Sequence, residues 1–461
     1  MRFQFLNRTE ELRRIKAVLE RSGQEMVCVY GRRRLGKSRL ITEAIQGLPA
    51  VYYVGDERDA PIQRASLAQE IGLQLPGFEH VTYPGWEQLL QRWWSDAPPN
   101  AVLVIDEFPY LVESSPELPS LLQKLIDRPM GNSRKLVLSG SSQRMMLGLL
   151  LDQSAPLYGR ATELMKLQPL APALMKGPLK LRSDRSVVEH YAAWGGVPRY
   201  WELAADHPGL WAAIEHLVLN PLGVLYHEPE AILLDDLKEI ARASSILSLV
   251  GRGCGRLSEI AGRLGVPATS LSRPIRRLVE LGLLERQTPW GTPPRSSKTS
   301  IYLVADPLLK LWYRFVEPNR SRLERGQMAT VREVMQRAWR QYLGDSWEKM
   351  ARDSVARATL LGSQWFPAQR WWGAGTNRTP LELDILAEST SDPGTVLVGE
   401  VKLSASAKEA KTLLEELGRK AALCPKLKGK QVVLGLWVLD WKHGKRLKRT
   451  NVFGVSEVIH P

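Results

Sequence analysis

The hydrophobic positions of the first 170 residues fall in short runs that are separated by amphipathic stretches. Apolar residues spaced three and four apart in those stretches are typical of helices, and continuous Val, Leu and Ile runs are typical of buried strands. The runs predict strands at Met26–Tyr30, Ala50–Val54, Ala101–Ile105 and Lys135–Ser139. The stretches predict helices at Arg8–Arg21, Lys37–Gln46, Gln63–Leu75 and Trp86–Trp94. Alternation of this kind indicates a parallel α/β sheet.

Beyond this region the pattern changes twice. It is helical over 171–240, and a helix–turn–helix pattern follows at Leu257–Leu264 and Thr269–Leu281. Candidate strands at Leu283–Arg286 and Ser300–Val304 flank a tip rich in Pro, Gly and Ser, Thr288–Thr299. A helix–turn–helix followed by a hairpin indicates a winged helix, which we place at 241–305.

For the last part of the chain, the pattern predicts a helical linker, 306–340, and a second α/β region, 341–461. Its expected strands are Leu381–Ala387, Val396–Val401 and Val432–Leu439. Together with a first α/β unit at 1–170 and a helical lid at 171–240, this gives five segments in 461 residues. Such a length is typical of a chain with several domains.

The composition indicates the cell compartment of the protein and the chemical class of its partner. The chain carries 63 Lys and Arg against 49 Asp and Glu, a formal net charge of +14, which favours a polyanionic partner. The three cysteines lie far apart, which is typical of a protein from a reducing compartment. No apolar run is long enough to span a membrane and no signal core is recognisable, so we expect a cytoplasmic protein with no membrane partner.

The segment Gly31–Ser38 fits the pattern G-x-x-x-x-G-K-[ST], between a predicted strand and a predicted helix. In such a loop the backbone N–H groups hold phosphate oxygens, the Lys reaches the β- and γ-phosphates, and the Ser hydroxyl ligates Mg²⁺. We therefore expect ATP and Mg²⁺ as cofactors and a P-loop NTPase sheet. The expected nucleotide contacts are Gly31, Arg32, Arg33, Arg34, Leu35, Gly36, Lys37, Ser38 and Arg39.

Two acids at the end of a later strand complete the expected ATPase site. Asp106 and Glu107 follow the apolar run Ala101–Ile105. Ligands bind at the carboxyl ends of parallel strands, so Asp106 is expected to hold the Mg²⁺ shell and Glu107 to act as general base towards water. Taken alone, the pair could also be two solvated acids at a strand end.

The fourth predicted strand ends in Ser139-Gly140-Ser141-Ser142. A polar side chain here would lie between the two strands of the phosphate site and could contact the γ-phosphate. Ser141 is our first choice and Ser139 the second, while a simple helix N-cap is the alternative. Arg160 could add positive charge to the transition state in cis or in trans, or could be an exposed arginine with no such role.

These motifs together resemble the archaeal-type ATPases, a branch of the AAA+/STAND P-loop NTPases. The resemblance is carried by Phe5–Leu12, the phosphate loop, Val104–Glu107, Leu138–Ser141 and Gly195–Pro198. It implies that Asn7 and Arg8 lie over the nucleotide base and that Pro198 closes the adenine side from the lid. The run Arg32-Arg33-Arg34 is unusually basic for the family and could face solvent or add anion affinity.

The second predicted helix of the helix–turn–helix has an apolar stripe and a polar side. Residues 251–300 hold nine Lys or Arg and three acids, which suits contacts to nucleic-acid phosphates. DNA binding, with RNA as an option, is weighed equally against a packing role for the winged helix. The expected DNA contacts are Ser270, Ser272, Arg273, Arg276 and Arg277.

The C-terminal α/β region carries a series of acids with a lysine. Glu400 and Lys402 are two apart on a predicted strand and share a face, and Asp384 ends a neighbouring strand. Glu348 lies on a predicted helix upstream. Two carboxylates can hold Mg²⁺ against a phosphate while the lysine steadies the attacking hydroxide, but two strands with solvated acids would give the same pattern.

This series resembles the PD-(D/E)XK restriction-endonuclease-like nucleases, over about 341–430, without the usual Pro before Asp384. The resemblance implies metal binding by Asp384 and Glu400, and catalysis with Glu348 and Lys402. Our leading hypothesis is an ATPase that gates a DNA-bound nuclease. The alternatives are a STAND-like switch with a non-catalytic nuclease fold and a DNA-binding regulator, and a homo-oligomer is left open.

Overall fold

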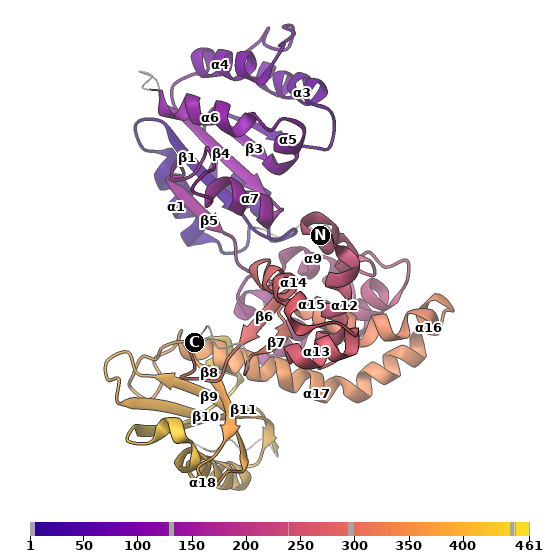
Figure 1. Cartoon of the computed structure of the whole chain (residues 1–461), viewed down its shortest axis with the longest axis vertical. Helices are drawn as coiled ribbons and strands as arrows, with labels where there is room; N and C mark the ends of the chain where they lie inside the picture. Colours follow the sequence, from indigo (N-terminus) through magenta and orange to yellow (C-terminus); the bar gives the residue numbers. More distant parts are fainter. Residues whose placement is uncertain are drawn as a thin grey trace.

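The structure is a computed structural model and describes residues 5–128, 133–237, 239–293, 299–442, 447 and 449–460. It consists of a nucleotide-binding sheet, a middle section of helices with a small hairpin, and a C-terminal sheet (Figure 1). Within the described ranges, no helix has both the length and the apolar character needed to cross a membrane.

The first sheet has five strands in the order β2-β3-β4-β1-β5, and all its pairings are parallel. The strands are β1 (Glu25–Tyr30), β2 (Ala50–Val54), β3 (Ala101–Asp106), β4 (Arg134–Gly140) and β5 (Glu163–Lys166). The helices around it are α1 (Thr9–Leu19), α2 (Lys37–Ala44), α3 (Ala60–Gly72), α4 (Trp86–Asp96), α5 (Phe108–Ser114), α6 (Leu118–Asp127) and α7 (Gln143–Leu150). The predicted parallel α/β sheet is confirmed.

Both faces of this sheet are buried, which explains the continuous apolar runs in the sequence. Met26 and Cys28 of β1 face one core, which α3 to α7 help to build, whereas Val27 and Val29 face the core on the side of α1 and α2. Strand β4 lies between β1 and β3. The serines after β4 therefore lie between the phosphate loop, which follows β1, and the two acids, which follow β3.

The lid, our name for η1 to α11, follows β5 and is helical. Its elements are η1 (Pro172–Met175), α8 (Asp184–Trp194), α9 (Pro198–Ala204), α10 (Leu210–Ile214), η2 (Glu215–Leu219) and α11 (Glu228–Asp236). Gly196 touches the segment before η1, and a Cβ at this position would stand 2.2 Å from the Leu170 carbonyl oxygen. Only glycine allows so close an approach, which joins the lid to the end of the first sheet.

A helix–turn–helix with a two-stranded wing comes next, as the sequence predicts. Its elements are α12 (Ile240–Gly251), α13 (Leu257–Leu264), α14 (Ala268–Glu280), β6 (Leu284–Gln287) and β7 (Ile301–Val304). Part of the expected tip, residues 294–298, lies outside the described residues. The stripe Leu271, Ile275 and Leu278 of α14 is buried and belongs to the same apolar core as the lid.

The C-terminal part is a mixed sheet with one long helix packed against it. The sheet order is β12-β11-β10-β9-β8, with β9 antiparallel to β8 and β10, and β10, β11 and β12 parallel. Its strands are β8 (Gln369–Ala374), β9 (Pro380–Glu388), β10 (Thr395–Ala405), β11 (Gln431–Trp441) and β12 (Val452–Phe453). The remaining elements are α15 (Pro307–Leu311), η3 (Trp312–Val316), η4 (Glu317–Asn319), α16 (Arg320–Glu324), α17 (Met328–Val355), α18 (Ala407–Leu423), η5 (Pro425–Leu427) and α19 (Val455–Ile459).

Helix α17 runs without a break through residue 340, where we expected a change of domain. It packs against α8 in the lid and against β9 and β10 in the C-terminal sheet. In Figure 1 it extends from below the middle section to the C-terminal sheet. The helix therefore contacts both parts, which also meet where α19 packs against α8 and where the Trp290 N–H donates to the Arg370 carbonyl oxygen at 2.8 Å.

Candidate functional site

The phosphate loop connects β1 to α2 and wraps around the ammonium group of Lys37. This group donates to the carbonyl oxygens of Gly31, at 2.9 Å, and Arg32, at 3.3 Å, and to the Ser141 hydroxyl, at 2.8 Å. Gly36, directly before α2, has φ +88°, a left-handed conformation that favours glycine. The loop is thus closed around a buried cation at the start of a helix, which is a geometry suited to an anion.

Asp106 is the centre of a polar cluster beside the loop. Its Oδ2 accepts hydrogen bonds from the Ser38 and Tyr52 hydroxyls, both at 2.6 Å, and its Oδ1 accepts from Ser139. Burial raises the pKa of Tyr52, and the negative charge of Asp106 raises it further. A carboxylate and a hydroxyl oxygen side by side are hard-oxygen ligands of the kind that Mg²⁺ takes in nucleotide sites.

Glu107 stands next to this cluster in a left-handed conformation, with φ 52°. Its Oε2 accepts from the Ser141 backbone N–H at 2.9 Å, and its Oε1 accepts from the Ser141 hydroxyl. Because Ser141 also accepts from Lys37, one serine links the lysine of the loop to the second acid of β3. The structure therefore brings together Lys37, Ser38, Asp106, Glu107 and Ser141, and it places both Ser139 and Ser141 in the cluster.

Of the residues expected beside the nucleotide base, Arg8 and Pro198 line one small cavity, whereas Asn7 is exposed and is not part of its lining. Phe5, Leu6 and Arg8 line this cavity with Leu35 and Gly36 of the loop, and the same cavity is lined by Arg39, Leu170, Pro198 and Glu202. Arg8 is buried and donates to the Leu35 carbonyl oxygen at 3.0 Å. The segment before α1 and the start of α9 thus meet beside the phosphate loop.

The arginines of the loop behave differently from one another. Arg33 is exposed, but Arg32 and Arg34 point to acids outside the first sheet. Arg32 forms an ion pair with Asp306 at 2.5 Å, and Arg34 one with Glu228 at 2.9 Å. The side chains of Arg32 and Arg34 are therefore engaged by acids, which leaves the loop backbone and the Lys37 ammonium group to hold phosphates.

Arg160 does not reach the nucleotide site of its own chain. Its guanidinium donates to both oxygens of Asp127, at 3.0 and 2.8 Å. The following Thr162 donates its N–H to the Met26 carbonyl oxygen, which places this segment at the start of β1. The phosphate loop follows the other end of that strand, about 20 Å away at about 3.3 Å per residue. The position excludes the expected role in cis, and a role in trans stays a prediction.

The expected DNA contacts on α14 lie largely on the surface. Ser272, Arg273 and Arg276 are exposed, and Arg277 is partly buried near Glu280. Ser270 is exposed as well, but its hydroxyl donates to the Pro267 carbonyl oxygen at 2.7 Å. This set forms the outer side of the helix, opposite its buried stripe.

The acids of the C-terminal region converge as expected. Strand β10 pairs with β9 so that Gly399 faces Ile385, which sets Asp384 beside Glu400. Burial raises the pKa of Asp384 to about 7, and the negative charges of Glu348 and Glu400 contribute. Glu348 reaches this position from α17, which the Trp347 indole fixes to the Lys402 carbonyl oxygen at 3.2 Å.

Cations surround these acids. Glu400 forms ion pairs with Lys402 at 2.6 Å and with Lys420 of α18 at 3.0 Å. Glu348 forms ion pairs with Arg352 at 2.5 Å and with Arg370 at 3.1 Å. Among the residues that the structure describes, no three His, Cys, Asp or Glu side chains gather closely enough to hold a metal ion. Asp384 and Glu400 are thus two carboxylate donors in a cluster that already carries positive charge.

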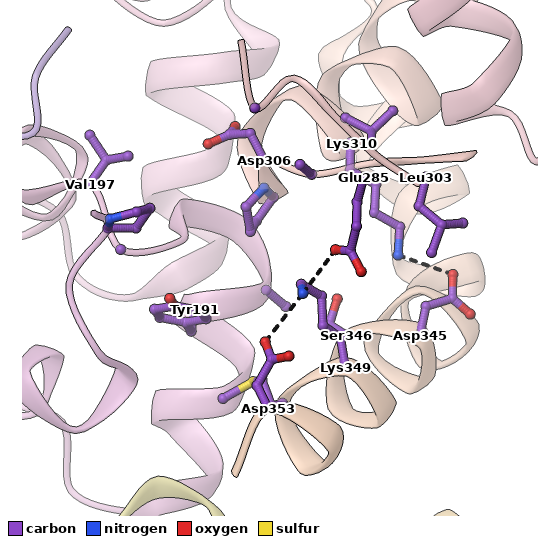
Figure 2. Close-up of a pocket in the computed structure, with 18 of the residues that line it drawn as sticks. Tyr191, Val197, Glu285, Leu303, Asp306, Lys310, Asp345, Ser346, Lys349 and Asp353 are labelled. Carbon is purple, nitrogen blue, oxygen red and sulfur yellow. Dashed lines mark hydrogen bonds and ion pairs between the residues drawn. The ribbon is translucent and has the colours of Figure 1, made fainter. Parts of the chain in front are cut away.

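A cavity of about 680 Å³ lies between the lid, the wing, α15 and α17. Figure 2 shows Lys349 between Glu285 and Asp353, to which it is paired at 2.9 and 3.2 Å, and Lys310 on Asp345. Arg32 of the phosphate loop and Glu348 of the acid cluster both contribute to its lining. The cavity therefore adjoins both candidate sites.

Several functional side chains escape prediction from the sequence. Tyr52, Lys420, Tyr200, Glu228 and Asp306 carry no motif of their own. For Tyr52 a weak signal exists, because the strand next to β3 can direct alternate side chains towards the end of β3. For the other four, only the folded chain reveals the contact.

Three family models match parts of the chain. A model described as an ATPase domain predominantly from Archaea matches residues 5–203, and the IclR helix-turn-helix domain matches residues 239–288. A third, described as Archaea bacterial proteins of unknown function, matches residues 312–413. The expected likeness to archaeal ATPases is confirmed for the first part, and the chain carries a helix–turn–helix of the IclR type. The third description names no activity.

The similarity to two known proteins extends over more than one domain of the chain. The chain is 27% identical over 423 residues to the uncharacterized protein MJECL04 of Methanocaldococcus jannaschii. That alignment covers 91% of this chain and 92% of the other protein. Among solved structures, the Walker-type ATPase PABY2304 of Pyrococcus abyssi aligns with a TM-score of 0.52 and 18% identity. That alignment covers 67% of this chain and 96% of the other, and it shows a shared fold.

Proposed function

We propose that the chain binds and hydrolyses ATP with Mg²⁺ at the phosphate loop. The observation that carries this is the convergence of Lys37, Ser38, Asp106, Glu107 and Ser141 from three separate segments at the carboxyl ends of the strands. A buried lysine, a hydroxyl and two carboxylates in this arrangement match the parts that phosphoryl transfer to water requires.

The chain's own groups have distinct tasks in this reaction. Mg²⁺ held by Ser38 and Asp106 would supply charge that neutralises the phosphate oxygens. Lys37 adds positive charge at the same oxygens, and Glu107 takes the proton of the water that attacks the γ-phosphorus. The new P–O bond forms as the bond to the β-phosphate oxygen breaks. Ser141 holds the Glu107 carboxylate through its N–H and hydroxyl, and so orients the base.

Phosphate release and nucleotide affinity test this proposal together. We expect Glu107→Gln to bind ATP as the wild type does and to lose at least a hundredfold in turnover, because the water loses its base, a group typically worth about 10²–10⁴ in rate. Lys37→Ala should bind ATP weakly. Glu113→Gln, an exposed acid on α5, is the matched control. Wild-type turnover by Glu107→Gln would show that another group activates the water.

We further propose that α14 of the helix–turn–helix binds DNA. Its exposed side carries Ser272, Arg273 and Arg276, and the IclR match covers the helix. Arginine and serine at the surface of a second helix suit phosphates and base edges in a major groove. The net charge of +14 favours the same partner.

For the C-terminal cluster, the leading proposal is a Mg²⁺-dependent nuclease of the PD-(D/E)XK type. The mixed sheet, the adjacency of Asp384 and Glu400, and the Lys402 ammonium beside them support it. Burial is the main cause of the raised pKa of Asp384, and the negative charges of Glu348 and Glu400 add to it, so a divalent cation would favour the ionised carboxylate. In this role Asp384 and Glu400 hold the metal, and Lys402 steadies the attacking hydroxide.

A second candidate is a nucleotide-controlled switch whose C-terminal unit holds nucleic acid without cutting it. The observation in its favour is the pairing of Glu400 with two lysines and of Glu348 with two arginines. Acids that are already neutralised need no metal, and the lysines and arginines around them suit a phosphate backbone.

Nicking of supercoiled plasmid separates the two candidates. A nuclease should nick DNA when Mg²⁺ and ATP are present, and Asp384→Asn should lose this activity while Glu415→Gln, an exposed acid on α18, keeps it. A switch should leave the plasmid intact in every preparation and retard it in a gel. Equal nicking by wild type and Asp384→Asn would reveal a contaminating nuclease and count against the proposed site.

A further inference from the structure

Two arginines of the phosphate loop are anchored to buried acids that come from distant parts of the chain. Glu228 is the first residue of α11 in the lid, and Asp306 precedes α15, after the wing. Their side chains are 4% and 6% exposed. A buried carboxylate is retained only where a partner satisfies it, and here the partners are Arg34 and Arg32.

Tyr200 of α9 joins the two ion pairs into one network. Its hydroxyl donates to Glu228 Oε1 at 2.7 Å and accepts from Arg32 Nη2 at 2.9 Å. The guanidinium carbon of Arg34 lies 5.9 Å from the centre of the Tyr200 ring. Asp306 is fixed in turn, because its Oδ1 accepts the Leu309 N–H at 2.8 Å as the N-cap of α15. Every member of the network is therefore held by at least one other group.

Arg32 and Arg34 belong to the phosphate loop, whose backbone we propose to bind phosphate. Arg32 and Arg34 flank Arg33 in the loop, and Arg34 has φ 68°, a left-handed conformation that costs a non-glycine residue free energy. The ion pair with Glu228 holds Arg34 in that conformation. A loop that is already fixed in its binding geometry loses less entropy when a ligand arrives.

We propose that Glu228 and Asp306 are positioning residues for the phosphate loop, and that they couple nucleotide binding to the placement of α11 and α15. This inference rests on the proposed binding of ATP. The two acids act through Arg34 and Arg32, with which they form ion pairs. By linkage, a nucleotide that needs the anchored loop favours the arrangement in which α11 and α15 are docked. Asp306 also lines the large cavity that reaches Glu348 (Figure 2), so the anchor lies on the path between the two candidate sites.

Equilibrium binding of a fluorescent ATP analogue tests the inference. We expect Glu228→Gln and Arg34→Gln each to raise the Kd about tenfold, which corresponds to the loss of about one charge-assisted hydrogen bond. The double variant should bind within about twofold of either single variant, because both remove the same pair. Asp306→Asn and Arg32→Gln should behave in the same way. Turnover at saturating ATP by Glu228→Gln and Asp306→Asn should stay within about twofold of wild type, since the catalytic groups remain in place.

The controls separate positioning from general stability. Glu215→Gln breaks an ion pair of similar length but greater exposure between the lid and α17, with Arg332 at 2.8 Å, and it should leave the Kd unchanged. Arg34 is 29% exposed, so Arg34→Gln tests the same contact if Glu228→Gln does not fold. Wild-type affinity in both single variants, or effects that multiply in the double variant, would overturn the inference while Lys37→Ala still shows the loop to be the ATP site. A wild-type chain that binds no ATP would overturn the proposed function and the inference with it.

Discussion

At the scale of single residues, Ser141 connects the two halves of the ATPase site. Lys37 donates to its hydroxyl at 2.8 Å, and both oxygens of Glu107 accept hydrogen bonds from it. Glu107 adopts a left-handed backbone conformation that alone is unfavourable, and such strain persists only where neighbours fix it. The serine supplies that constraint.

We expect Ser141→Ala to lower kcat for ATP about tenfold with a small change in KM, because one orienting hydrogen bond is worth about 1.4 kcal/mol in the rate. Steady-state phosphate release measures both constants. Ser142→Ala is the control, since Ser142 caps α7 by accepting from the Met145 N–H at 3.4 Å. The control should cost about 1 kcal/mol of stability and leave kcat unchanged. A normal kcat in Ser141→Ala would mean that Glu107 is oriented by its backbone alone.

At the scale of elements, α14 presents two different sides. One side is buried against the rest of the helix–turn–helix, and the other carries exposed serine and arginine side chains. The carbonyl oxygen of Leu281, just after the helix, accepts from the buried Gln143 side chain at 2.9 Å. Gln143 follows Ser139, Ser141 and Ser142 in the chain. It therefore links the segment that forms part of the ATPase site to the end of α14.

The double variant Arg273→Ala/Arg276→Ala tests the exposed side. If each arginine contacts a phosphate, the affinity for duplex DNA should fall, and the slope of log K against log salt should become shallower by about 2, since each contact releases about one counterion. Fluorescence anisotropy at several salt concentrations gives both values. The pair Arg322→Ala/Arg325→Ala removes two exposed arginines around α16 and should keep the wild-type slope. An unchanged slope in the first variant would assign α14 to packing.

The helices and strands of the structure agree with the sequence prediction in some places and differ from it in others. Four of the five strands of the first sheet, β1 to β4, were predicted to within one residue at each end, because each is a largely apolar run. Strand β5 was not expected, since it is a four-residue edge strand with charged residues at both ends. Strand β8 was not expected, since its sequence mixes polar and aromatic residues at the edge of its sheet. The continuity of α17 was also missed, because we expected the helical linker to end at residue 340 and a new unit to begin there, whereas one helix packs against both the lid and the C-terminal sheet.

The residues of the candidate sites also fall into two groups, those that the sequence predicts and those that only the folded chain brings together. Motif residues could be found from the sequence because their spacing within a strand, loop or helix is fixed by local geometry. The network around Arg32 could not, since Arg32 and Asp306 are separated by 274 positions and neither helix propensity nor periodicity links them. Lys420 was missed for the same reason: α18 brings it to Glu400 only when the helix packs on β10.

At the scale of the whole molecule, the position of Arg160 bears on assembly. Its segment lies at the edge of the sheet opposite the phosphate loop, so it can reach a nucleotide only in a second copy of the chain. We expect Arg160→Ala and Lys37→Ala each to retain less than about a tenth of wild-type ATPase activity, since an arginine supplied in trans can contribute about 10³ or more. An equimolar mixture of the two should recover activity, because the Lys37→Ala chain still offers Arg160 to an intact loop.

The control mixture is Arg160→Ala with the double variant Lys37→Ala/Arg160→Ala, in which no chain can supply the arginine. It should stay inactive. Wild-type activity in Arg160→Ala alone would leave its ion pair with Asp127 as a structural contact on the surface.

The long helix α17 has a mechanical consequence. Its 28 residues form a rod about 42 Å long at 1.5 Å per residue. Arg332 pairs with Glu215 of the lid, and Trp347 is hydrogen-bonded to Lys402 of the C-terminal sheet, so these two contacts lie about 22 Å apart along the axis. A tilt of about 10° about the first contact would move the second by about 4 Å, and Glu348 would move with it.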